Sequence, residues 1–106
     1  MDKKIYSFSY DLDSDGADYS ALYAEICKFN NCQCLESTWL IATELPIKDV
    51  AASLEKALKP GDRYFLHELL GEDYRGRAYK RYGVWDWIKK MREPPQKNSE
   101  SEVKAD

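Results

Sequence analysis

The sequence predicts an α+β domain whose elements follow the order β-α-β-β-α-β, with a short helix at the end. Residues 3–13 alternate between large and small side chains, and a period of two indicates a half-buried strand. Two later segments, residues 19–30 and 47–58, repeat apolar residues every three or four positions, which is typical of amphipathic helices. Residues 33–44 and 63–69 are rich in strand-forming residues.

The first strand organises this prediction because its two faces differ. One face is large and mostly aromatic and the other is small and hydroxylated. The two faces consist of Tyr6, Phe8, Tyr10 and Leu12, and of Ile5, Ser7, Ser9 and Asp11. We expect the aromatic face to lie under a layer of helices, where it buries apolar surface. Asp11 stands where the strand gives way to an Asp-Gly loop at residues 13–16, so we expect any functional site to begin there.

The next elements are predicted from their caps and breakers. Asp18 can cap the first helix, and the asparagines at residues 30–31 end it. The run at residues 33–44 is too long for one short strand, so we predict two strands with a bend near Glu36 and Ser37. A Leu-Pro turn at residues 45–46 begins the second helix, and Lys-Pro-Gly at residues 59–61 ends it.

The last elements complete a known arrangement. Residues 63–69 predict a strand, residues 71–77 a loop, and residues 84–92 a closing helix. One antiparallel sheet with two helices on one face is the ferredoxin-like arrangement. It leaves the other face open, and a small chain covers such a face most simply by pairing with a second copy. We predict one domain over residues 1–93 and a disordered polar tail over residues 94–106.

Composition excludes several classes of protein. With 43% hydrophobic and 33% charged residues, the chain is typical of a soluble globular domain. No apolar run approaches the roughly 18 residues of a membrane span, and the N-terminus lacks a signal peptide's apolar region. We therefore expect no membrane partner and a cytoplasmic location. The three cysteines, Cys27, Cys32 and Cys34, favour a reducing compartment and packing roles over disulfides or zinc.

Charge is unevenly distributed along the chain. Residues 74–92 hold seven bases and one acid, a net charge of +6, whereas residues 1–73 hold 14 acids and seven bases. The basic segment interleaves cations with aromatic rings, which suits the phosphates and bases of a single-stranded nucleic acid. Its predicted contacts with RNA or DNA are Arg75, Arg77, Tyr79, Lys80 and Arg81. The alternative is a solvated loop that packs its tyrosines on the fold or pairs with the acidic body.

Three further side chains have a structural and a functional interpretation. Trp85 and Trp87 lie two residues apart and cannot share one face of a helix. We expect one to be buried and the other to lie at an interface with a second copy or another protein. His67 could act as a general acid or base, although a histidine in an aromatic strand also serves as a structural residue.

The loop after the first strand suggests a metal site. Residues 11–16 read Asp-Leu-Asp-Ser-Asp-Gly, the opening of a calcium-binding loop whose alternating carboxylates reach one ion. The twelfth position is Leu22, where a bidentate glutamate should stand, which argues against an EF-hand. Weak Ca²⁺ or Mg²⁺ binding by Asp11 and Asp13 stays open beside an acidic turn that caps the next helix.

Several of these features together resemble a known superfamily. They are Tyr10-Asp11 ending the first strand, an amphipathic helix, Gln33 and Ser37 leading to an aromatic residue, and a leucine-rich helix entered through a Leu-Pro turn. Over residues 4–70 the chain resembles the small CRISPR-associated spacer-acquisition endonucleases and the related virulence-associated protein D toxins, and especially their short standalone relatives. The gap from Gln33 to Ser37 is longer than in that superfamily's usual pattern.

The resemblance implies a ferredoxin-like homodimer in which Asp11 faces its twin across a two-fold axis and helps to hold a divalent metal. Mg²⁺ bound by one or two carboxylates could polarise a phosphodiester and activate water, so the resemblance implies a Mg²⁺-dependent endoribonuclease. The alternative is a non-catalytic dimeric interaction module, an adaptor, regulator or inhibitor in mobile-element or defence biology. It is motivated by the few catalytic side chains, since Asp11 and His67 are the main candidates.

Overall fold

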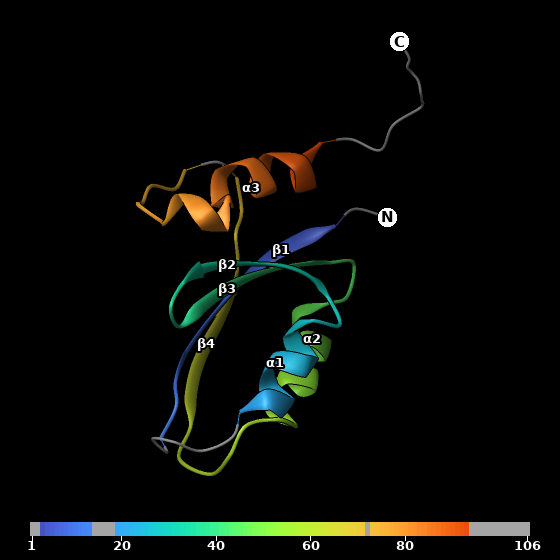
Figure 1. The fold of residues 1–106 in the computed structure, drawn as a ribbon. Coiled ribbons are helices and arrows are strands. Elements are labelled where there is room, and N and C mark those ends of the chain that lie inside the picture. The colour runs from blue at the N-terminus through green and yellow to red at the C-terminus, as the bar shows by residue number, and fades with distance from the viewer. Residues whose placement is uncertain (1–2, 14–18, 72, 94–106) are drawn as a thin grey trace.

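The structure, a computed structural model, describes residues 3–13, 19–71 and 73–93, and it confirms the α+β class (Figure 1). The described residues form one four-stranded antiparallel sheet, three α-helices and a short 3₁₀ helix. In chain order the elements are β1 (Lys4–Asp11), α1 (Ser20–Ile26), β2 (Asn30–Leu35), β3 (Thr38–Thr43), α2 (Ile47–Glu55), β4 (Arg63–Glu68), η1 (Lys80–Tyr82) and α3 (Val84–Arg92).

The sheet has the strand order β2-β3-β1-β4, with β1 in the interior. β1 pairs antiparallel with β3 on one side and with β4 on the other. In this register Ser9 lies between Thr38 and Phe65, and Asp11 lies opposite Arg63. Successive side chains of a strand point to opposite faces, so residues that are paired across the sheet share a face.

One face of the sheet, here called the helical face, carries the main core. Figure 1 shows α1 and α2 together on this side of the sheet. The large side chains of β1 are buried beneath them, with Phe8 fully enclosed and Tyr10 only 6% exposed. The core partners from the other elements include Leu22, Ile26, Ile41, Val50 and Leu54. The expected burial of the aromatic face of the first strand is therefore observed.

The tyrosine hydroxyls of this face are satisfied by hydrogen bonds. Tyr6 donates its hydroxyl proton to the Leu45 carbonyl at 2.7 Å. The Trp39 indole N–H donates to the Tyr10 hydroxyl at 3.1 Å, while burial raises the pKa of Tyr10 to about 12. A buried polar group that keeps a partner avoids the cost of desolvation, so an aromatic strand with hydroxyl groups can line a core.

The second face is half covered by the C-terminal arm, the segment of residues 73–93 that contains η1 and α3. Val84 and Ile88 of α3 are buried against Ile5, Cys32 and other residues of this face. Figure 1 shows α3 apart from α1 and α2. Three hydrogen bonds secure the arm: the Cys32 thiol to the Tyr82 carbonyl at 3.2 Å, the Trp87 indole to Asn30 Oδ1 at 3.2 Å, and Arg92 to the Leu69 carbonyl at 2.6 Å.

The arm corrects the expectation that the second face is bare until another copy covers it. Part of that face is covered by the chain itself, because α3 buries apolar side chains there. The rest is called the open half. It consists of Ser7, Ser9, Asp11, Arg63, Phe65 and His67, which are exposed or partly exposed. Phe65 alone is 67% exposed.

Two boundaries differ from the sequence prediction. α1 ends at Ile26 and β2 begins at Asn30, whereas the helical spacing had suggested a helix to residue 30. Asn30 and Asn31 pair with Ala42 and Ile41 of β3, and these ladder hydrogen bonds outweigh the weak strand propensity of asparagine. The bend at Glu36 and Ser37 is confirmed. Asp18 and the predicted tail at residues 94–106 lie outside the described residues.

The helical face predicts a stability effect at Ile41. This side chain of β3 is fully buried in the core of the helical face, so Ile41→Ala should lower the free energy of unfolding by about 2–5 kcal/mol through lost burial and a cavity. Urea denaturation followed by circular dichroism measures it. Leu70→Ala is the control, since Leu70 is 73% exposed and its loss should change stability by less than about 0.5 kcal/mol. Equal effects of the two substitutions would contradict the described core.

Candidate nucleic-acid interface

The C-terminal arm places the predicted cations on the surface. Arg75, Arg77, Lys80 and Arg81 are all exposed. None of them forms an ion pair with a carboxylate in the part of the chain that the structure describes, where Lys28 and Glu25 make the ion pair found. Within the described residues, the acidic body therefore does not neutralise these cations. The arm presents them to solvent.

Aromatic rings orient one of these cations. The Arg81 guanidinium lies 4.2 Å from the centroid of the Tyr79 ring and 5.1 Å from that of Tyr82. The two rings meet edge to face at 5.7 Å. Each cation–π contact at an exposed site contributes about 0.5–1 kcal/mol, so the guanidinium is held in place while Tyr79 remains 56% exposed. An ordered cation and an exposed ring thus stand side by side.

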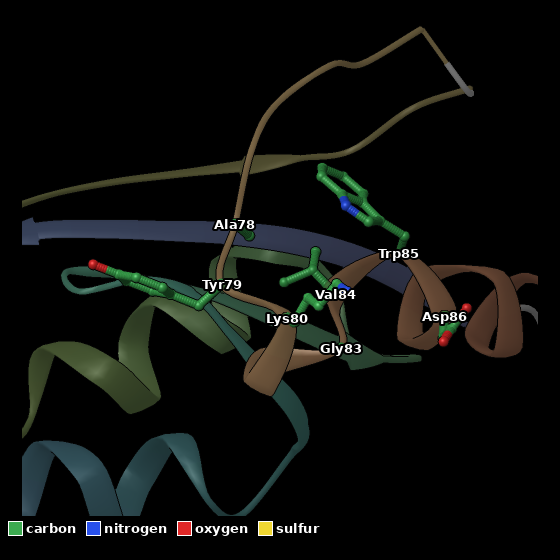
Figure 2. A pocket seen from close by; sticks show the side chains of 7 residues that line it. All are labelled: Ala78, Tyr79, Lys80, Gly83, Val84, Trp85 and Asp86. Carbon is green, nitrogen blue, oxygen red and sulfur yellow. The ribbon is translucent and has the colours of Figure 1, made fainter.

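A hollow of about 170 Å³ lies beside this pair (Figure 2). It is lined by residues 78–80 and 83–86, and Figure 2 shows Val84 and Lys80 between the Tyr79 and Trp85 side chains. Gly83 has a φ of +61°, a left-handed conformation that glycine adopts without strain. This turn separates η1 from α3 and brings residues 79 and 85 to one hollow.

The two tryptophans of α3 have different surroundings. Trp87 is partly buried, packs against the second face and donates to Asn30. Trp85 is 45% exposed and stacks on Tyr74, with ring centroids 6.3 Å apart and planes inclined by 10°. The tryptophans divide as expected into one that faces the sheet and one that faces solvent, although Trp87 is partly and not fully buried. A role of either residue at an interface stays a prediction.

Asp11 and Asp13 do not form a metal cluster in the described residues. Asp11 is exposed at the end of β1 on the second face, opposite Arg63. Asp13 lies over the turn at residues 59–62, since a Cβ at Gly61 would come within 2.6 Å of Asp13 Oδ2. No group of three His, Cys, Asp or Glu side chains in the described ranges could hold a metal ion. Residues 14–18 of the predicted calcium loop lie outside those ranges.

Asp62 is a structural residue that the sequence analysis missed. Its carboxylate accepts hydrogen bonds from the backbone N–H of Asp13 at 2.8 Å, from that of Lys59 at 2.7 Å and from the Tyr19 hydroxyl at 2.9 Å. Burial alone would raise the pKa of the Asp62 carboxyl, but these donors hold it below its usual value. Asp62 thereby anchors the chain just after Asp11. The Pro-Gly-Asp turn was the available sequence signal.

The remaining candidates are Gln33, the cysteines and His67. The Gln33 amide donates to the carbonyls of Leu35 and Glu36 at 3.2 and 3.4 Å, so it supports the turn between β2 and β3. The cysteines of the described chain are free thiols. His67 is exposed on the open half, with its ring 5.3 Å from that of Phe65.

Comparisons with protein-family models, with curated proteins and with solved structures find no significant match to this chain. Among the described residues, no helix has the length and apolar character needed to cross a membrane.

The contacts of Asp62 predict a pH-dependent stability difference. The pKa of Asp62 in the folded protein is lowered from its usual value of 3.8. The ionised Asp62 carboxylate therefore stabilises the fold above pH 3.8, and this stabilisation is lost as the pH falls through the folded-state pKa. The melting temperature of Asp62→Asn should therefore lie below that of the wild type near pH 7, and the gap should narrow below about pH 4. Thermal melts between pH 7 and pH 3 measure this.

The matched control is Glu44→Gln, which removes an exposed carboxylate and should leave the melting temperature close to that of the wild type across the range. A gap for Asp62→Asn that stays constant down to pH 3 would mean that the charge of Asp62 does not stabilise the fold.

Proposed function

We propose that this protein binds nucleic acid through its C-terminal arm. The observation that carries the proposal is the exposed pair formed by Arg81 and Tyr79, flanked by Lys80, Arg75 and Arg77. These cations form no ion pair with a carboxylate of the described residues, so they can neutralise phosphates and release their counterions. The acidic remainder of the chain repels a polyanion, so the arm supplies most of the electrostatic attraction for one.

Single-stranded RNA or DNA is the form that suits the arm best. Tyr79 and Trp85 are exposed by 56% and 45%, and their flat rings can stack on unpaired bases, which a duplex keeps stacked inside. The hollow of about 170 Å³ between them is too small to accept a nucleic-acid duplex. It can admit a base or a sugar of a flexible strand.

The proposal predicts a change in salt dependence. Replacing Arg75, Arg77, Lys80 and Arg81 with alanine should weaken binding of a single-stranded oligonucleotide. It should also flatten the negative slope of log affinity against log salt by about 3, since each phosphate contact contributes about 0.7 to its magnitude. Filter binding at several salt concentrations measures both quantities. The four side chains are exposed, so the variant should fold.

A control separates local contacts from overall charge. Lys80→Ala/Arg81→Ala and Lys48→Ala/Lys56→Ala each remove two exposed cations, but the second pair lies on or next to α2, which covers the helical face. Only the first pair should lower the slope. Equal effects of the two pairs, or no retained RNA or DNA at low salt, would refute binding through the arm.

We also propose that the fold is ferredoxin-like and that the protein acts as a homodimer. The order of elements and the placement of β1 between β3 and β4 support the fold. The edge strands β2 and β4 of the described sheet support the dimer, because an exposed strand edge can pair with that of a second copy. In such a dimer two Asp11 carboxylates could share a Mg²⁺ ion that polarises a phosphodiester of RNA.

This cleavage proposal is tested by Asp11→Asn. The variant should lose Mg²⁺-dependent cleavage of single-stranded RNA, because one carboxylate of the shared metal site is removed from each copy, while analytical ultracentrifugation still finds a dimer. Glu44→Gln is the control with an exposed acid elsewhere. Cleavage that persists in Asp11→Asn or in a chelator would exclude the mechanism, and a wild-type monomer would exclude the shared site.

A non-catalytic interaction module is the second candidate, and the exposure of Trp85 favours it. A half-exposed tryptophan held flat on Tyr74 has the character of an aromatic anchor for a protein partner, whose truncation costs about 2 kcal/mol or more. The oligonucleotide experiment distinguishes the two candidates, since a protein interface does not require affinity for RNA or DNA at low salt.

A further inference from the structure

A second hollow, of about 260 Å³, lies on the open half of the sheet, where β1 ends and β4 begins. Its lining combines an aromatic ring, a guanidinium, a carboxylate and a hydroxyl. The residues are Ser9, Tyr10, Asp11, Arg63, Tyr64 and Phe65. Drug-sized ligands occupy pockets of about 300–1,000 Å³, so this hollow suits one ring-bearing unit of a longer ligand.

Phe65 gives the hollow a stacking surface. Its side chain is 67% exposed although it lies in the middle of β4. The neighbour across β1 is Ser9, whose hydroxyl is hydrogen-bonded to that of Thr38 at 3.0 Å, so no large side chain covers the ring from that side. His67 stands two residues further, with its ring 5.3 Å away and inclined by 40°. An exposed ring of this kind can stack on a base of any identity.

Arg63 and Asp11 bring opposite charges to the same hollow. They are partners in the register of β4 and β1, and they form no ion pair with each other within the described residues. Arg63 and Phe65 are two residues apart on one strand face, about 6.8 Å along the strand. A guanidinium binds phosphate oxygens in a fork geometry, and a carboxylate next to a nucleotide site accepts a hydrogen bond from the ribose 2′-hydroxyl.

We propose that this hollow binds one ribonucleotide of a single-stranded RNA, with the base on Phe65, the ribose 2′-hydroxyl on Asp11 and a phosphate on Arg63. Three parts of a ribonucleotide thereby meet three side chains of matching chemistry. The inference rests on the proposed nucleic-acid binding, which it extends from the arm to the sheet, but its residues are different. It adds a preference for RNA over DNA, since a deoxyribose offers nothing to Asp11.

Fluorescence anisotropy of a labelled RNA octamer and a DNA octamer of equivalent sequence tests the proposal, in chelator so that a metal does not contribute. The wild type should bind RNA more tightly than DNA. Phe65→Ala should weaken the RNA complex by about 5- to 100-fold through lost stacking. Asp11→Ala should bring the RNA and DNA affinities together, and Arg63→Ala should weaken both and lower the salt slope by about 0.7.

Leu70→Ala is the matched control, because it removes an exposed apolar side chain that does not line the hollow, and it should leave both affinities unchanged. Unchanged RNA affinity in Phe65→Ala, or an RNA preference that survives Asp11→Ala, would overturn the proposal. So would a loss of dimer in Phe65→Ala at unchanged RNA affinity, which would assign the open half to a second copy.

The variant without the four cations of the arm separates this proposal from the preceding one. When that variant is titrated with adenosine 5′-monophosphate and followed by NMR, the backbone amide resonances of Ser9, Arg63 and Phe65 should still shift. If the arm proposal fails, the octamer affinity is insensitive to the four cations but these shifts remain. If the shifts are absent in both the wild type and the variant, the hollow is not a nucleotide site.

Discussion

The two-sided burial of β1 is the constraint on which the other elements depend. Successive side chains of a strand point to opposite faces of its sheet, so the two sets of β1 side chains meet different surroundings. Tyr6, Phe8 and Tyr10 pack against the layer of α1 and α2, whereas Ile5 packs beneath α3. The smaller serines on the second face leave room there. The alternation of this one strand therefore sets which helices lie on which side and where the sheet stays open.

The C-terminal arm is amphipathic, with one side packed on the sheet and the other exposed. Val84 and Ile88 bury against the sheet, and the same segment turns its cations to solvent. Arg92 is an exception, because its guanidinium is used to hold the Leu69 carbonyl. The basic character of the arm is thus divided: one cation fastens it to the fold, and the cations near Tyr79 remain available to an anion.

The arm and the ribonucleotide hollow belong to the same side of the molecule. The arm packs on the second face through Ile5 and Cys32, and the hollow lies on the open half of that face with Phe65 and Arg63. A strand of RNA long enough to leave the arm would find the hollow without crossing to the helical face. The two proposed binding surfaces therefore lie on one face of the sheet.

The sequence by itself determined the elements whose signals are local. The period of β1, the apolar stripe of α2 and the bend at Glu36 and Ser37 depend on neighbouring residues, so they were predictable. The start of β2 at Asn30 was not, because its ladder partner Ala42 is distant in the sequence. The tertiary structure also decided the coverage of the second face and the meeting of Asp11, Arg63 and Phe65 in one hollow. Those outcomes depend on strand register and on packing between distant segments, which local propensity does not encode.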